Sequence, residues 1–342
     1  MPDRRKVALL CSLAIAACND AIGEGKLRTR LSAATCSTAL VEQQGQLQQG
    51  QLQQGCQQQG TGLLGAPVET PINHSYTGWW NRHPLKPARL VGGQLLGDGD
   101  ALAGAALAGT WIPAKAGDTS IRTVVRSAWQ DPTYSDGSTW LYAVDVYDPA
   151  AGAFSPLCAT DANGVAAAIP IAATFDTSGN RVESTTEFTF ACTAGALAKC
   201  YRWGYRPWLT DASGSSAAFA NLHWACTRMA RADYCGNGHS WTKNGTTINV
   251  WDTAPAPGPF QAHGPTDPAF AFEAGWSTYG AVCLSKERWA TLDPRIAQEC
   301  PDRLIPPGAS TGAATVCDTP DGASVFDSST QLFDESKVNV SP

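Results

Sequence analysis

Residues 215–236 read SSAAFANLHWACTRMARADYCG, and this stretch decides the fold because it contains the one convincing helix pattern of the chain. At about 100° per residue its apolar positions fall on one stripe. The stripe consists of Phe219, Leu222, His223, Cys226, Met229 and Ala230. Gly236 and Gly238 follow, and glycine commonly ends a helix. The pattern predicts one principal helix over residues 215–233.

The segments around this helix have strand patterns. Residues 120–129 and 139–147 are rich in β-branched and aromatic side chains, and an Asp-Pro turn signal follows each of them. Residues 181–190 alternate and could form a hairpin with 197–205. Residues 247–251 follow an Asn-Gly turn signal. We therefore predict an α+β fold: a mostly antiparallel β-sheet with one principal helix, stabilised by disulfides, between a disordered N-terminal tether and a disordered C-terminal tail.

The N-terminus has the pattern of an export signal. Basic residues 4–6 precede the uncharged run 7–17, which is too short to span a bilayer as an anchor. The run ends Ile15-Ala16-Ala17-Cys18, which resembles the lipobox of bacterial lipoproteins. That resemblance implies cleavage after Ala17 and lipidation of Cys18, and Asn19 favours the outer membrane. The alternative is an ordinary signal peptide with a chance cysteine.

The composition divides the rest of the chain. A five-residue Gly-Gln-Leu-Gln-Gln period starts at Gly45 and is typical of a polar linker or a degenerate pentapeptide repeat. We expect a signal peptide (1–17), a lipidated tether with this repeat (18–62), a degenerate repeat or β linker region (63–118), a globular domain (119–300) and a polar acidic tail (301–342).

The charge of the chain limits its partners. The formal net charge is −6, and removal of residues 1–17 takes away three basic residues and one acidic residue, which leaves −8. A chain with this acidic excess lacks the cations that neutralise phosphates, so we expect no nucleic-acid partner. The expected partners are a membrane, through the N-terminal lipid anchor, and an envelope glycan or protein. The sequence also lacks a phosphate loop and a zinc-protease motif, and we expect no cofactor.

The cysteines point to an oxidising compartment. Eight of them lie in or near the globular domain: Cys158, Cys192, Cys200, Cys226, Cys235, Cys283, Cys300 and Cys317. An even set in an exported chain is typical of a disulfide framework, although eight cysteines allow on the order of a hundred connectivities. Short loops favour the pairs 192–200, 226–235 and 283–300, which would leave 158 with 317.

Several separated motifs carry a family resemblance. They are Ala198-Lys199-Cys200, residues 204–208 (GYRPW), residues 223–229 (HWACTRM), residues 232–235 (ADYC) and residues 280–283 (GAVC). In this order they resemble the ADYC domain, a largely myxobacterial family of bacterial proteins, with the domain core over 192–283. The resemblance implies no activity. Lipoprotein signals and glutamine-glycine-leucine repeats also fit that family.

A structural interpretation of the motif comes first. Its residues are Arg228, Arg231, Ala232, Asp233, Tyr234 and Cys235. Either arginine could pair with Asp233 or with carbonyls at the end of the helix, where cations are favoured. Cys235 would bond to Cys226 and clamp the turn, and His223 would be a core-edge histidine with one hydrogen-bonded nitrogen.

Two chemical interpretations remain open beside it. His223, Cys226, Cys235 and His239 offer two nitrogens and two sulfurs, a set that zinc accepts. Alternatively, His223 could activate Cys226 with Asp233 as the orienting group, or His223, Asp233 and Asp252 could perform acid–base chemistry on a glycan or peptide. The zinc set would make the protein a metalloprotein, whereas the thiol or acid–base chemistry would make it an envelope hydrolase.

The twelve tryptophans suggest a further role. Aromatic side chains usually serve the core, but a subset could line the floor of a carbohydrate- or peptidoglycan-binding groove: Trp79, Trp80, Trp203, Trp208, Trp241 and Trp251. We therefore expect an exported envelope lipoprotein whose domain serves binding or structure, and hydrolysis is the alternative.

Overall fold

The computed structural model describes the part of the chain from residue 51 to residue 337, with gaps. The described ranges are 51–53, 66–67, 72–80, 83–85, 88–97, 100–134, 136–149, 151–161, 163–242, 246–252, 254, 261, 267–288, 294–303, 317 and 329–337. The predicted signal peptide, Cys18 and most of the tether and repeat lie outside these residues.

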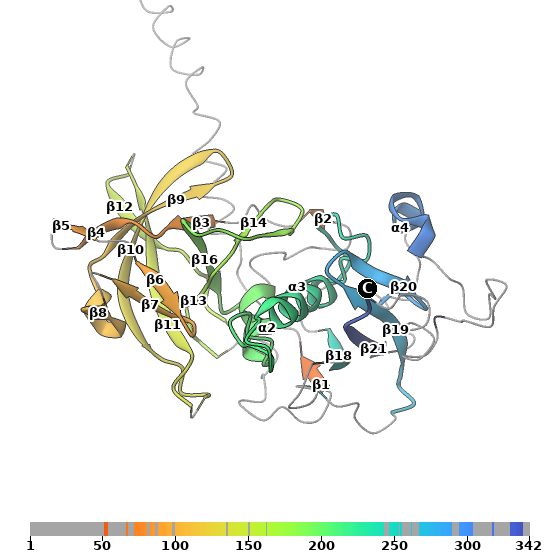
Figure 1. Cartoon of the computed structure of the whole chain (residues 1–342). Coiled ribbons are helices and arrows are strands. Elements are labelled where there is room, and N and C mark those ends of the chain that lie inside the picture. The colour runs from red at the N-terminus through yellow and green to blue at the C-terminus, as the bar shows by residue number, and fades with distance from the viewer. Residues whose placement is uncertain are drawn as a thin grey trace, which may run out of the picture.

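A nine-stranded antiparallel sheet forms one half of the molecule (Figure 1). Its strands are β3 (Ile72–Ser75), β4 (Gly78–Trp80), β5 (His83–Leu85), β9 (Trp111–Ala116), β10 (Thr119–Gln130), β11 (Trp140–Asp148), β12 (Ala153–Pro156), β13 (Ala168–Ile171) and β16 (Glu187–Cys192). The order is β10-β11-β13-β16-β3-β9-β4-β5, and β12 pairs with β11.

Strand β10 closes this sheet on itself. It pairs with β9 through residues 119–124 and with β11 through residues 122–130. The pairings therefore join β10, β11, β13, β16, β3 and β9 into a ring of six strands. The inward side chains form one hydrophobic core, which includes Ile112, Val125, Tyr142 and Phe190.

A five-stranded antiparallel sheet forms the other half (Figure 1). Its order is β1 (Gln51–Gln53), β18 (Thr247–Asp252), β21 (Leu332–Lys337), β19 (Phe270–Ser277) and β20 (Gly280–Leu284). Smaller pairings join β2 (Ala66–Pro67) to β17 (His239–Ser240), β14 (Thr174–Phe175) to β15 (Arg181–Val182), and β6 (Arg89–Val91) to β7 (Gln94–Gly97) and β8 (Leu102–Ala103).

Two helices lie between the sheets, α2 (Ala196–Arg202) and α3 (Ala217–Arg231), as Figure 1 shows. The apolar stripe of α3 packs on the five-stranded sheet in a core with Trp276, Ile248 and Leu332. Helix α2 covers β13 and β16 from outside the ring through Leu197, Ala198 and Tyr201. The short elements are α4 (Pro294–Glu299), η1 (Gly104–Leu107) and η2 (Pro301–Arg303).

The fold is β-rich, mostly antiparallel and stabilised by disulfides, as predicted. The predicted hairpin of 181–190 with 197–205 is wrong, because residues 196–202 form α2. The Ala-Leu-Ala-Lys sequence there favours a helix over a strand. Gly195 precedes it with extended backbone angles (φ −92°, ψ 161°), as an N-cap requires.

The two ends of the predicted globular domain also differ from the structure. Strands β3, β4, β5 and β9 come from the expected linker region 63–118 and are integral to the nine-stranded sheet. The expected tail 301–342 supplies β21, which lies between β18 and β19. The sequence hides this strand because only Leu332 and Phe333 are apolar, and its buried Asp334 is stabilised by tertiary partners.

Across the described residues, no helix is both long enough and apolar enough to cross a bilayer.

Candidate functional site

The motif at the end of α3 forms a tight backbone turn. Ala232 adopts left-handed angles (φ 51°, ψ 43°), which reverse the chain direction after the last helical residue. The amide of Ala232 donates to the carbonyl of Met229, and the amide of Asp233 donates to that of Arg228, each at 2.9 Å. The turn brings the side chain of Asp233 back toward Arg228 and Arg231 in the last turn of the helix.

Both motif arginines pair with Asp233, in agreement with the structural interpretation. Arg228 Nη1 lies 2.5 Å and Arg231 Nη2 lies 3.0 Å from Asp233 Oδ2. The amides of Asn237 and Gly238 also donate to this carboxylate, at 3.1 and 3.2 Å. The pairs are buried, and burial lowers the pKa of Arg231 to about 10 against the opposing effect of Asp233. A carboxylate with this many donors is a structural anchor.

Arg228 also ties the helix to two other segments. Its Nε donates to the carbonyl of Thr278 (3.1 Å), between β19 and β20. Its Nη1 and Nη2 donate to the carbonyl of Ser178 (2.6 Å) and to Asn180 Oδ1 (2.7 Å), between β14 and β15. One fully buried guanidinium therefore connects α3 with a loop of each half of the molecule.

Tyr234 connects the motif to a second buried ionic cluster. Its hydroxyl donates to Glu273 Oε1 (3.0 Å) and accepts from the amide of Arg288 (2.8 Å). The guanidinium of Arg288 lies 2.9 Å from both Glu273 and Asp334. Burial and the Glu273 carboxylate raise the pKa of Asp334 well above its usual value. Burial opposes ionisation of Glu273, but Arg288 and Lys286 outweigh it and lower the pKa of Glu273.

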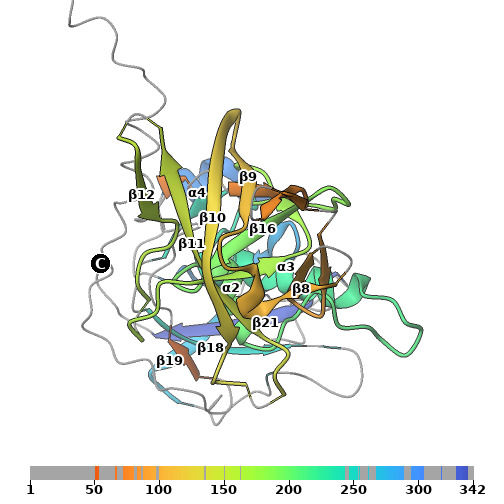
Figure 2. The ribbon, with the colours of Figure 1, turned by 90° about the vertical axis from the view of Figure 1, so that its left-hand side faces the viewer.

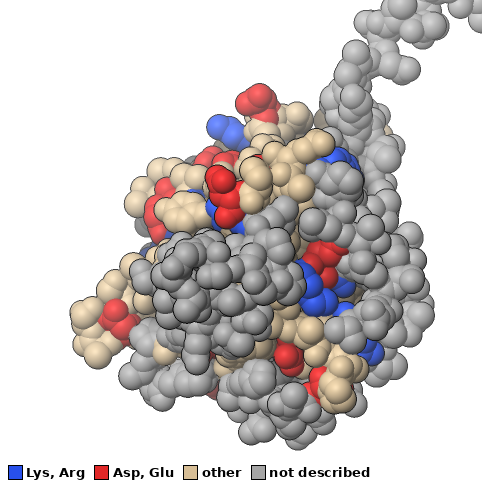
Figure 3. All heavy atoms as spheres, turned by 90° about the vertical axis from the view of Figure 1, so that its right-hand side faces the viewer, with Lys and Arg blue, Asp and Glu red and all other residues tan. Residues whose placement is uncertain are grey.

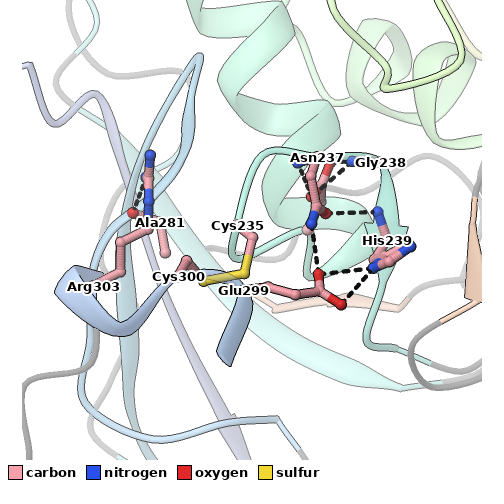
Figure 4. The surroundings of a disulfide bond; sticks show 9 residues. Cys235, Asn237, Gly238, His239, Ala281, Glu299, Cys300 and Arg303 are labelled. Carbon is pink, nitrogen blue, oxygen red and sulfur yellow. Dashed lines mark hydrogen bonds and ion pairs between the residues drawn. A yellow bond between two sulfur atoms is a disulfide. The ribbon is translucent and has the colours of Figure 1, made fainter. Parts of the chain in front are cut away.

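Cys235, the last motif residue, bonds to Cys300 after α4 (Figure 4). Beside this bond, His239 Nδ1 lies 2.8 Å from Glu299 Oε2, and Asn237 Nδ2 donates to the same oxygen at 2.5 Å. The motif therefore holds the segment 294–303 through one covalent bond and one polar cluster.

All eight predicted cysteines form disulfides, but each predicted pairing is wrong. The bonds are Cys158–Cys192, Cys200–Cys226, Cys235–Cys300 and Cys283–Cys317. Loop length favours near neighbours, whereas tertiary packing decides which sulfurs meet. Cys200 and Cys226 face each other across the α2–α3 interface, and neither can reach its sequence neighbour while bonded there.

The catalytic candidates do not form one site. His223 is fully buried, and its Nε2 lies 3.0 Å from the carbonyl oxygen of Leu197. Burial lowers its pKa to about 4. Asp233 lies beyond the C-terminal end of α3, where it pairs with Arg228 and Arg231. Asp252 instead accepts from the Tyr205 hydroxyl (2.9 Å) and the Gln261 amide (2.8 Å). These contacts make His223 the core histidine that the structural interpretation predicts.

The thiolate and zinc interpretations fail on the sulfurs. Cys226 and Cys235 are bonded to other cysteines, so neither is available as a nucleophile or as a thiolate ligand. His223 and His239 also have different partners, Leu197 and Glu299. In the described part of the chain, no group of three or more His, Cys, Asp or Glu side chains is placed to hold a metal ion.

The predicted tryptophan groove is not assembled either. Trp203 and Trp241 are buried in the core between α3 and the five-stranded sheet, and Trp251 is buried in a smaller cluster with Val282 and Phe333. Trp80 and Trp208 pack against other cores, whereas Trp79 is 49% exposed. Sequence reasoning missed the Glu273–Arg288–Asp334 cluster. One signal was available: Glu273 is the single charged residue in the apolar run 269–276.

The molecule is thus a β-rich, disulfide-stabilised protein in which a conspicuous helix-end motif is buried as a structural junction. The model of the ADYC domain family matches residues 99–290, more than half of the chain, and the protein belongs to this family. The match extends further toward the N-terminus than residues 192–283 and takes in β9 to β13. No curated protein and no solved structure matches the chain.

Proposed function

We propose that this protein is an exported envelope lipoprotein whose ADYC domain serves binding or structure rather than catalysis at its motif. The observation that carries the proposal is the pairing of all eight cysteines between residues 158 and 317. Disulfides persist outside the cytoplasm and are rare within it. The predicted export signal over residues 1–17 supports the same compartment.

Lipidation of Cys18 supplies the anchor in this proposal. Two or three acyl chains bury enough methylenes, at about 0.8 kcal/mol each, to hold a protein stably on a membrane. The glycine- and glutamine-rich sequence that follows is typical of a flexible linker. It would let the domain reach beyond the lipid surface, and Asn19 favours the outer membrane.

The burial of the motif favours binding or structure over hydrolysis. His223, Arg228 and Asp233 are each 0% exposed. A catalytic group must reach the substrate within hydrogen-bond distance, and these three side chains are occupied in holding the helix end and its neighbours. Under this proposal the functional surface of the domain lies elsewhere, on its exposed strands.

Acyl labelling tests the proposal. Bacteria that express the full chain are grown with an alkyne-palmitate, and the protein is probed for label and for free thiols without reduction. We expect labelled protein in the membrane fraction. We also expect all eight domain cysteines to be unreactive toward the thiol probe, because they are disulfide-bonded. The Cys18→Ala variant is the control and should lose the label. An unlabelled wild-type chain that retains residues 1–17, or free thiols among those eight cysteines, would overturn the proposal.

A further inference from the structure

The outer surface of the strand ring carries a group of exposed aromatic side chains. Strands β9, β10, β11 and β12 lie side by side on the side of the molecule that faces the viewer in Figure 2. Cross-strand pairing places Trp79 opposite Trp111, and Tyr147 opposite both Arg122 and Phe154. Residues directly opposite share one side of a sheet. We call this surface the aromatic face: Trp79, Trp111, Arg122, Arg126, Tyr147 and Phe154.

Three rings of this face, those of Trp111, Tyr147 and Phe154, contact one another. The Trp111 centroid lies 5.9 Å from that of Tyr147 and 5.4 Å from that of Phe154, and the last two lie 5.2 Å apart. These separations are those of favourable aromatic pairs. The cluster also covers Val124, which pairs with Trp111 and Asp145 yet is only 3% exposed. These three rings therefore form a preorganised surface and not a set of independent side chains.

The core does not account for these rings. The interior of the ring has its own aromatic residues, including Phe188 and Phe190. Trp79 and Phe154 remain 49% and 39% exposed. A contiguous exposed apolar surface of this kind commonly marks a binding site.

The aromatic face is also basic, although the chain as a whole is acidic. The guanidinium of Arg122 lies 5.2 Å from the centroid of Tyr147, and that of Arg126 lies 4.3 Å from the centroid of Phe154. Lys115 is exposed on the same side of β9. The carboxylate of Asp145 in β11 also lies on this side of the sheet, where it pairs with Arg126 at 2.6 Å. By contrast, the opposite side of the molecule shows acidic and basic side chains next to one another (Figure 3).

We propose that the aromatic face binds an acidic polysaccharide. The inference rests on the proposed extracytoplasmic location and names the class of ligand for the binding role. A pyranose ring has a face of C–H groups that packs on the electron-rich face of an aromatic ring. Trp79 and Trp111, adjacent across β4 and β9, offer neighbouring ring surfaces for successive sugars. Arg122 supplies the planar donor set that matches a carboxylate or sulfate.

Charge and shape favour this occupant over others. A neutral sugar would leave the excess of basic side chains unused, and a second copy docked through the same face would place its arginines against those of the first. A nucleic acid requires a longer run of cations along its backbone. An acidic polysaccharide would contact both the rings and the guanidinium groups. Salt should weaken only the electrostatic contribution of the arginines to its binding free energy.

Affinity electrophoresis tests the inference on the full exported chain. Gels contain pectate, alginate or hyaluronan as acidic polysaccharides, and methyl-esterified pectin or dextran as neutral counterparts. We expect retardation by at least one acidic polysaccharide and clearly less by the neutral polymers. The Trp79→Ala and Arg122→Gln variants should each weaken binding about tenfold, equivalent to about 1.4 kcal/mol. Arg122→Lys should restore it only in part, since a lysine lacks the planar donor set.

Matched substitutions away from the face control for general effects. Tyr279→Ala removes an aromatic side chain that is 67% exposed near α3, and Arg89→Gln removes an exposed arginine of β6. Both should bind as the wild type does. Circular dichroism of Trp79→Ala should match the wild type, because Trp79 contributes little to the core.

Other results would overturn the inference. They are migration unaffected by every acidic polysaccharide, equal retardation by neutral polymers, binding only to phospholipid vesicles or single-stranded DNA, and self-association that Trp79→Ala abolishes. Acyl labelling separates this failure from failure of the proposed function. A chain labelled at Cys18 that binds no acidic polysaccharide refutes only the ligand, whereas binding by an unlabelled, thiol-free chain refutes only the anchor.

Discussion

Asp233 accepts a hydrogen bond from Arg228 Nη1 at 2.5 Å, and neither side chain has any exposed surface. The pair joins the last turn of α3 to the turn that follows it. Because the same guanidinium donates to Ser178, Asn180 and Thr278, the pair organises the junction between the two halves. The charged residues of the motif are therefore explained by architecture.

Neutralising Asp233 tests this explanation. In Asp233→Asn the shape is kept, but the buried Arg228 and Arg231 lose the carboxylate with which both pair. Breaking a buried pair from one side typically costs about 3–5 kcal/mol. We expect a loss of this size in urea unfolding. The matched control is Asp100→Asn, which breaks the exposed pair with Arg89 and should change the stability far less, because water screens an exposed pair. Similar losses for the two variants would contradict the structural role of Asp233.

The sequence predicted the local parts of this site and missed the distant ones. Helix α3 was predictable because its buried positions recur along one short segment. The Arg228–Asp233 pair was predictable because its members are five residues apart. Glu273, Arg288 and Asp334 come from three separate segments, and β21 shows only two apolar residues. Their association depends on strand register, which no local pattern encodes.

The disulfides show the same limit. The even number of cysteines indicated four bonds, but the pairing rule used loop length alone. In the fold, Cys192 at the end of β16 meets Cys158 after β12, and Cys283 in β20 meets Cys317. Each of these pairs is brought together by the packing of the sheet strands and not by nearness in the sequence. The participation of these eight cysteines in disulfides could therefore be predicted from the sequence, whereas their connectivity could not.

Gly236 is the next test, because it touches the β19–β20 turn. Its φ is +68°, and a Cβ at this position would lie 2.0 Å from the carbonyl oxygen of Tyr279. We expect Gly236→Ala to cost about 3 kcal/mol or more, from backbone strain and displacement of the turn together. Gly214→Ala separates the two effects, since Gly214 has a φ of +82° and nothing within 4 Å of its Cβ position.

Gly214→Ala should therefore cost about 1–2 kcal/mol, the strain alone. The measurement is urea unfolding of both variants beside the wild type. If Gly236→Ala loses no more stability than Gly214→Ala, the close approach of the motif to the β19–β20 turn is refuted.

The Cys200–Cys226 bond should be a principal support of the helix pair. It joins α2 to α3 close to the contact of His223 with the Leu197 carbonyl. Removing a native disulfide typically costs about 2–5 kcal/mol. We expect a loss in this range for the Cys200→Ala/Cys226→Ala double variant. Mass spectrometry of an unreduced digest should first recover the 200–226 linkage. Recovery of linked 192–200 and 226–235 peptides would instead support the short-loop pairing.

Two buried histidines should make the protein sensitive to acid. Burial lowers the pKa of His223 to about 4 and that of His74 to about 3, from an ordinary value of 6.5. The unfolded chain therefore binds more protons than the folded one once the pH falls below about 6.5. The free energy of unfolding should drop as the pH falls from 7 to 4, by on the order of 3 kcal/mol for His223, and the drop should level off below the folded pKa.

A glutamine at position 223 should flatten this profile, since its amide does not titrate and can still donate to the Leu197 carbonyl. The measurement is urea unfolding of wild type and His223→Gln at pH 7, 5.5 and 4. His239→Gln is the control for the same substitution outside the core, because His239 is partly exposed beside Glu299. If His223→Gln is as acid-sensitive as the wild type, His223 is not the buried neutral histidine that links α3 to α2.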